Sequence, residues 1–144
     1  MTFLDAYPLV ALLANEPAAD EVEELLRRDR ASVAMVNLCE AIDVCQRVRA
    51  LPAGDIRNAL QPLLLVGTLA AVVSGQEEAW LAADLRTRFY NRKTRALSLA
   101  DCLLLAHARM SGEGVATSDP AVIEVARSEG MGVVALPDST GARP

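Results

Sequence analysis

The sequence predicts an α/β fold, a three-layer α/β/α sandwich with a central parallel sheet. Short apolar stretches alternate with longer helical patterns along the whole chain, which is typical of strand–helix–strand units. The length of 144 residues fits one domain. The hydrophobic content of 52% supplies a sizeable core, which must be aliphatic because only 3% of the residues are aromatic.

The first half of the chain contains three expected strands, each followed by a helical pattern. The strands are expected at residues 2–5, 32–36 and 68–73, and the helices at residues 8–13, 17–28, 37–50 and 55–65. Pro17 stands where a first-turn proline belongs, and Val22, Leu25 and Leu26 share one face of that helix. Asn37 is interpreted as the N-cap of the next helix.

The second half continues the alternation with clearer boundary signals. Helices are expected at residues 76–90, 99–110 and 120–129, and strands at residues 114–117 and 133–136. Ser98 is an expected N-cap, Gly112 ends the helix that follows it, and Gly130 occupies a left-handed position. We expect one domain over residues 1–137 and a loose tail over residues 138–144, which is rich in Gly, Pro, Ser and Thr.

The net charge of the chain and its local basic residues give opposite indications about nucleic-acid binding. The net charge of −5 argues against a nucleic-acid partner, since phosphate binding depends on cations. Five basic residues nevertheless fall in one short stretch, which could bind RNA phosphates. They are Arg86, Arg88, Arg92, Lys93 and Arg95. The alternative interpretation, a solvated helix end with cations near its C-terminus, stays open.

Cysteine usage and hydropathy predict a cytoplasmic protein without a membrane segment. Cys39, Cys45 and Cys102 form no CxxC motif, and Cys39 and Cys102 are expected to be buried, reduced thiols. No signal peptide is recognisable at the N-terminus. The longest apolar run, over residues 60–73, is interrupted by Pro62 and Gly67 and falls short of the ~20 residues of a membrane span.

Four carboxylates follow expected strands or begin expected helices. They are Asp5, Glu40, Asp101 and Asp119. In a parallel sheet these positions share one edge, where ligands bind. Each acid also has a structural explanation, because Asn37 with Glu40 and Ser98 with Asp101 have capping-box spacing, and Asp119 and Asp5 can cap helices.

The surroundings of the acids favour a metal site over simple capping. Asp5, Glu40 and Asp101 are flanked by apolar residues and have no basic neighbour in sequence, so burying them together needs compensation. A Mg²⁺ or Mn²⁺ ion provides it, since hard cations prefer oxygen ligands. Such an ion can activate water against a phosphodiester. The only histidine, His107, is interpreted as a core-edge or surface residue.

Together these segments resemble PIN-domain proteins, in particular the VapC toxins of bacterial toxin–antitoxin pairs. The resemblance covers nearly the whole chain and rests on Phe3-Leu4-Asp5, Val36-Asn37-Leu38-Cys39-Glu40, Leu97-Ser98-Leu99-Ala100-Asp101-Cys102 and Ala116-Thr117-Ser118-Asp119. It implies an Mg²⁺- or Mn²⁺-dependent endoribonuclease that cleaves structured RNA of the tRNA or rRNA class, forms a homodimer and is inhibited by a cognate antitoxin.

The same resemblance implies roles for individual residues. The four acids would be the catalytic metal ligands, and Thr117 or Ser118 would supply polar support to them. One departure concerns the positions after Asp5, where related proteins often have Ser or Thr and this chain has Ala6 and Tyr7.

Two other functions would also place acids at strand ends or preserve this fold. A receiver-like or phosphatase domain usually needs a lysine near its late strands, and Lys93 is far from the last strand in sequence. A non-catalytic PIN-like module that acts by binding a protein partner is the stronger alternative. Of the remaining acids, Asp43 is a candidate for the edge of the site and Asp84 is expected at the surface.

Overall fold

Five short strands form a single sheet in which every neighbouring pair runs parallel, in the order β3-β2-β1-β4-β5. The computed structural model describes all 144 residues. The strands are β1 (Thr2–Leu4), β2 (Ala31–Ala34), β3 (Leu69–Val72), β4 (Gly114–Thr117) and β5 (Val133–Ala135). The predicted alternation of strands and helices is therefore confirmed.

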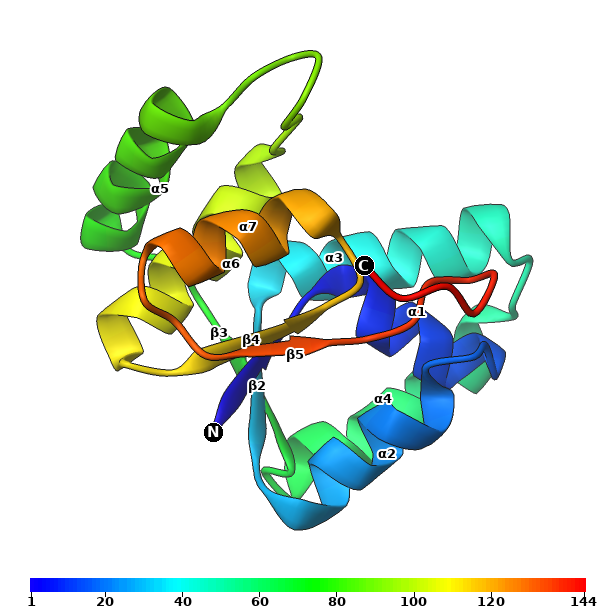
Figure 1. Cartoon of the computed structure of the whole chain (residues 1–144). Coiled ribbons are helices and arrows are strands. Elements are labelled where there is room, and N and C mark those ends of the chain that lie inside the picture. The colour runs from blue at the N-terminus through cyan, green and yellow to red at the C-terminus, as the bar shows by residue number, and fades with distance from the viewer.

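Helices cover both faces of this sheet, as the three-layer prediction requires (Figure 1). One layer contains α1 (Ala6–Ala14), α2 (Ala19–Arg28), α3 (Met35–Asp43) and α4 (Ala53–Leu65). The other contains α5 (Gln76–Phe89), α6 (Leu99–Ser111) and α7 (Pro120–Ser128). None of these helices combines the length and the apolarity that crossing a membrane demands.

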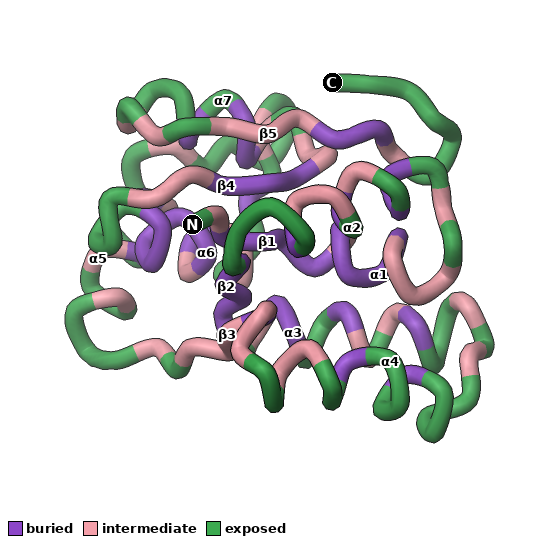
Figure 2. The backbone as a smooth tube through the Cα atoms, turned by 90° about the horizontal axis from the view of Figure 1, so that it is seen from below, coloured by how far each residue is buried: buried purple, intermediate pink, exposed green.

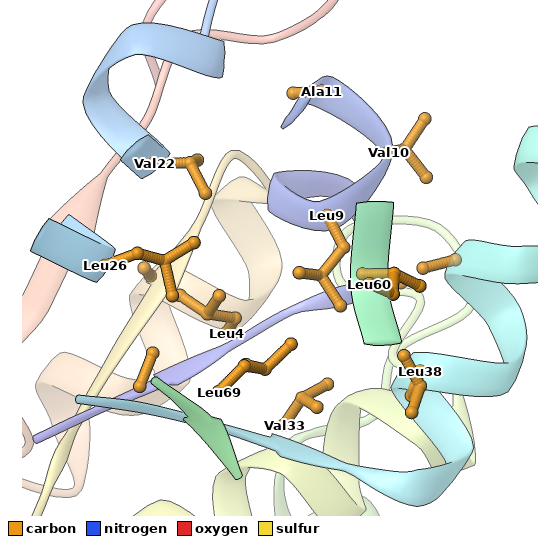
Figure 3. Packing of buried hydrophobic residues seen from close by; sticks show 14 of the residues in the cluster. Leu4, Leu9, Val10, Ala11, Val22, Leu26, Val33, Leu38, Leu60 and Leu69 are labelled. Atoms are coloured by element: carbon orange, nitrogen blue, oxygen red, sulfur yellow. The ribbon is translucent and has the colours of Figure 1, made fainter. Parts of the chain in front are cut away.

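Successive residues of a strand face opposite layers, and this divides the core into two aliphatic clusters. Leu4 belongs to the cluster under α1, α2 and α4, whereas the adjacent Phe3 belongs to the cluster under α5, α6 and α7. Leu9, Val33 and Leu69 meet in the first cluster (Figure 3). The central strands are almost wholly buried, while the outer sides of the helices are exposed (Figure 2). Leu, Ala and Val side chains make up most of this core, as expected from the scarcity of aromatic residues.

The start of α3 differs from the prediction. Asn37 is not an N-cap, because the backbone turns into the helix directly after Ala34 and Asn37 lies inside the first turn. Its side chain is fully buried and donates a hydrogen bond to Asp5 instead of capping the helix. Beyond Asp43 the helix continues as a π-helical turn over Val44–Val48 and does not reach residue 50 as an α-helix.

Two smaller expectations are also wrong. Pro17 precedes α2, which begins at Ala19 after Ala18, so the proline is not in its first turn. Cys39 is exposed on α3, whereas Cys45 and Cys102 are buried. An apolar flanking sequence therefore did not predict which side of α3 faces the core.

Candidate active site

The candidate site lies at the carboxyl edge of the sheet. Asp5 directly follows β1, and Asp119 lies two residues beyond β4. These strands are neighbours at the centre of the sheet, and the chain turns from them toward opposite edges. Such a switch point leaves a crevice outside the strand ends, where α/β proteins bind ligands.

Asp5 is the most constrained of the four acids. It is only 6% exposed, and its Oδ1 accepts a hydrogen bond of 2.7 Å from the backbone N–H of Ala6. The Thr117 hydroxyl donates to Oδ2 at 2.6 Å, and the Asn37 amide lies 3.4 Å from Oδ1. Burial raises the pKa of Asp5 to about 6 despite these hydrogen bonds, and the charges of Asp101 and Glu40 add to the rise.

The other carboxylates also influence one another. Glu40 is exposed on α3, but desolvation by the nearby protein raises its pKa, and the negative charges of Asp101 and Asp43 raise it further. The pKa of Asp101 is raised by burial and by the charge of Asp119, against the lowering effect of Ser98. Each of the four predicted acids therefore exerts or experiences repulsion from another, although they come from four separate segments of the chain.

Three of the acids also cap helices, as predicted: Asp5 caps α1, Asp101 caps α6 and Asp119 caps α7. Asp101 and Ser98 form a capping box, with Ser98 N–H donating to Asp101 Oδ2 at 2.6 Å and Asp101 N–H donating to Ser98 Oγ at 3.0 Å. Asp119 Oδ1 accepts from the N–H of Ala121 at 2.7 Å. Glu40 has no such role, since its carboxylate accepts no hydrogen bond and Asn37 does not cap α3. Capping thus leaves Glu40 unexplained.

The oxygen atoms of the four acids are suitable ligands for a hard divalent cation, but the four side chains lie too far apart to surround one ion. Carboxylate oxygens without a hydrogen bond remain on Glu40, Asp101 and Asp119, and oxygen ligands are what Mg²⁺ prefers. The Oδ1 atom of Asn37 is also buried without a partner beside Asp5. No three His, Cys, Asp or Glu side chains lie close enough together to enclose an ion. The chemistry of the residues fits the ion, and their side chains would have to draw closer to ligate it.

The polar residues at the end of β4 behave differently from each other. Thr117 is fully buried, donates to Asp5 and accepts a 3.0 Å hydrogen bond from the N–H of Asp119. It therefore links the two acids of the central strands. Ser118 makes no side-chain hydrogen bond to any of the four acids and is partly exposed.

The remaining candidates lie outside the acid cluster. Asp43 pairs with Arg47 at 2.7 Å on the exposed side of α3, although its charge reaches Glu40. Asp84 pairs with Arg88 at the surface of α5. His107 is buried in the middle of α6, stacks on Phe3 and hydrogen bonds the hydroxyl of Ser74 at 2.9 Å.

The five basic residues at the end of α5 divide into two groups. Arg88 forms ion pairs with Asp84 and Glu129, and Arg95 forms one with Glu124. Arg86, Arg92 and Lys93 have no carboxylate partner. Arg86, Arg92 and Lys93 are therefore the basic side chains of this stretch that can pair with a phosphate without first breaking an ion pair.

Comparison with known proteins gives a family match and several similar folds. The family model of the PIN domain matches residues 2–128. No curated protein matches the sequence. Among solved structures, VapBC2 from Rickettsia felis, bound to a DNA fragment from its promoter, is 15% identical over 92% of this chain and 96% of its own, with a TM-score of 0.67.

Two further solved structures have the same fold. A toxin–antitoxin complex from Klebsiella pneumoniae is 17% identical, covering 83% of this chain and 87% of its own, with a TM-score of 0.61. FitAcB from Neisseria gonorrhoeae is 19% identical, covering 92% of this chain and 96% of its own, with a TM-score of 0.61.

Proposed function

Because this chain belongs to the PIN-domain family, we propose that it is a metal-dependent endoribonuclease and the toxin of a bacterial toxin–antitoxin pair. The observation that carries the proposal is the gathering of four carboxylates at one sheet edge, where desolvation and, to a smaller extent, the charge of a neighbouring acid raise the pKa of Asp5, Glu40 and Asp101. A bound cation relieves such repulsion. The proposed substrate is structured RNA of the tRNA or rRNA class.

Asp5, Glu40, Asp101 and Asp119 would hold Mg²⁺ or Mn²⁺ in this site. When bound, the ion supplies an activated water and stabilises charge on the scissile phosphate. Thr117 holds Asp5 and the backbone of Asp119 in place through its two hydrogen bonds, so that the acids of β1 and β4 keep a fixed separation. The capping box fixes the Asp101 carboxylate at the start of α6.

We propose an antitoxin as the regulating partner, by analogy with the toxin–antitoxin complexes of the same fold. An apolar groove of about 640 Å³ between α1, α2 and α4 supports this, with Leu12, Leu26 and Leu63 in its lining. Next to it, at the end of α4, Leu65 is 77% exposed and Val66 is 72% exposed. Large exposed apolar side chains beside a groove are typical of a protein interaction site. We also propose that the protein forms a homodimer, as the resemblance to VapC toxins implies.

The decisive experiment measures RNA cleavage by the wild type, Asp5→Asn and Asp101→Asn in Mg²⁺, in Mn²⁺ and in chelator. Loss of a residue that only hydrogen bonds to a metal ligand lowers activity about 10- to 100-fold. We expect the cleavage activity of both variants to fall by more than this, because each variant removes a ligand itself. Chelator should abolish wild-type activity. Asp55→Asn, an exposed acid on α4, is the matched control and should cleave normally.

Persistent cleavage in both variants, or in chelator, would overturn the metal-site mechanism. A wild type that binds the antitoxin but cleaves no RNA would favour the non-catalytic binding module. The same experiment tests this alternative, to which the open spacing of the four acids also corresponds.

A further inference from the structure

A shallow hollow of about 410 Å³ lies where the end of α5 meets the start of α6. We call it the α5–α6 hollow, and it is lined by Ala83, Arg86, Thr87, Tyr90 and Leu99. Leu99 is the first residue of α6, two positions before Asp101. The hollow and the acid cluster therefore adjoin the same helix start.

The lining combines an aromatic ring with a fixed guanidinium group. Tyr90 is 44% exposed and Leu99 is 58% exposed, so apolar surface faces solvent here. The Arg86 guanidinium carbon lies 4.7 Å from the centre of the Tyr90 ring, and its Nε donates to the carbonyl of Leu97 at 3.2 Å. These contacts hold both side chains in place. Unstacked nucleobases bind on such aromatic rings and guanidinium planes.

The charge beside the hollow is positive, in a chain whose net charge is −5. Arg86, Arg92 and Lys93 are without carboxylate partners, unlike the neighbouring Arg88 and Arg95. The side chain of Asn91 accepts the N–H of Lys93 at 2.9 Å, and the backbones of Asn91 and Arg95 pair. This compact turn carries Arg92 and Lys93, and the segment that contains it stands out from the body of the molecule (Figure 1). Unpaired cations at this position attract a phosphate backbone.

We propose that the α5–α6 hollow binds an unpaired base of single-stranded RNA, stacked on Tyr90 and packed against Leu99, with the phosphate of that nucleotide paired to Arg86. The base would flank the phosphate that is cleaved at the carboxylates. The inference rests on the proposed ribonuclease function and adds a subsite to it. A peptide segment is the less suitable occupant, because only three of the five lining side chains are apolar or aromatic.

The test measures the binding of a short, fluorescein-labelled, single-stranded RNA of mixed sequence by anisotropy, in chelator so that cleavage does not interfere. Tyr90→Ala should weaken binding about 5- to 150-fold, the range found when one stacked base loses its aromatic partner. Tyr90→Phe keeps the ring and should bind within about two-fold of the wild type.

Matched controls separate the hollow from a general surface effect. Trp80→Ala removes another exposed aromatic side chain of α5, about 15 Å along the helix from Tyr90, and should leave binding unchanged. Arg86→Gln should weaken binding and reduce the salt dependence by about one charge. Arg127→Gln, an exposed arginine on α7, should do neither.

Equal binding by Tyr90→Ala and the wild type would overturn the subsite, as would a wild type that binds no RNA. Equal losses in Tyr90→Ala and Trp80→Ala would overturn it too. The cleavage assay of Asp101→Asn is independent of these results. Tyr90-dependent binding by a wild type that cannot cleave would support the subsite and contradict the nuclease. RNA cleavage by a wild type whose RNA binding is unchanged by Tyr90→Ala would support the nuclease and contradict the subsite.

Discussion

Asp5 is the residue at which stability and proposed function conflict. Its carboxylate is almost fully buried and lies within the field of Glu40 and Asp101, so its charged form is disfavoured in the folded protein. Thr117 and the N–H of Ala6 offset part of this cost by donating hydrogen bonds. An acid kept in so unfavourable a position suggests selection for function instead of stability.

Asp5→Asn should therefore stabilise the metal-free protein at neutral pH. The pKa of folded Asp5 is about 6, above its ordinary value of 3.8, because the folded protein favours the protonated carboxyl group. The contribution of Asp5 to the free energy of unfolding is therefore full below about pH 4 and is lost as the pH rises through about 6. The loss corresponds to roughly 3 kcal/mol at pH 7.5. Urea unfolding in chelator should show Asp5→Asn more stable than the wild type at pH 7.5, with a smaller difference at pH 4.

The exposed Asp55→Asn serves as the control, with no pH-dependent gain expected. If Asp5→Asn were less stable than the wild type by the same amount at both pH values, Asp5 would be a purely structural cap.

Thr117→Val should destabilise the protein by removing the hydroxyl between β1 and β4. The change leaves Asp5 Oδ2 without its donor and Asp119 N–H without its acceptor. Each unsatisfied buried group costs about 1–3 kcal/mol. Thr117→Ser keeps the hydroxyl and should recover most of the loss in urea unfolding. Equal losses in the two variants would assign the effect to packing of the methyl group.

At the scale of elements, two helix starts with similar sequence patterns have different structures. Ser98 and Asp101 form the predicted capping box, while Asn37 and Glu40, at the same spacing, do not. The sequence could not distinguish them, because the difference lies in burial. The Asn37 side chain is completely enclosed and its partner Asp5 is 32 residues away. Local spacing predicts local hydrogen bonds only where no distant group competes.

Ser98→Ala should lower the stability of α6 in a measurable way. The Ser98 hydroxyl accepts the N–H of Asp101, and loss of such an N-cap costs about 1 kcal/mol. Thermal unfolding should show a Tm about 3 °C lower for a domain of this size. Ser111→Ala, at the exposed far end of the same helix, is the control and should leave the Tm unchanged. A Tm shift of equal size in both variants would refute a specific role for the cap.

At the scale of the whole molecule, the alternation of elements predicted the layers but not the order of the strands. Parallel pairing follows from helical connections between strands. The adjacency of β1 and β4 does not, since 109 residues separate Leu4 at the end of β1 from Gly114 at the start of β4. That adjacency brings Asp5 next to Thr117 and Asp119, so the hydrogen bonds of the site became visible only in the fold.

Because the four acids come from segments that are distant in the chain, a cation held by them should stabilise the whole fold. An ion that binds only the folded state adds about 2.7 kcal/mol at a concentration about a hundred times its Kd. Mn²⁺ should therefore raise the Tm of the wild type and of Asp55→Asn in a concentration-dependent way. The rise should be much smaller in Asp5→Asn and Asp101→Asn, even though Asp5→Asn begins from a higher Tm in chelator. Equal Mn²⁺ effects in all four proteins would mean that the ion binds elsewhere, and the carboxylates at the sheet edge would then lack the ligand proposed to hold them together.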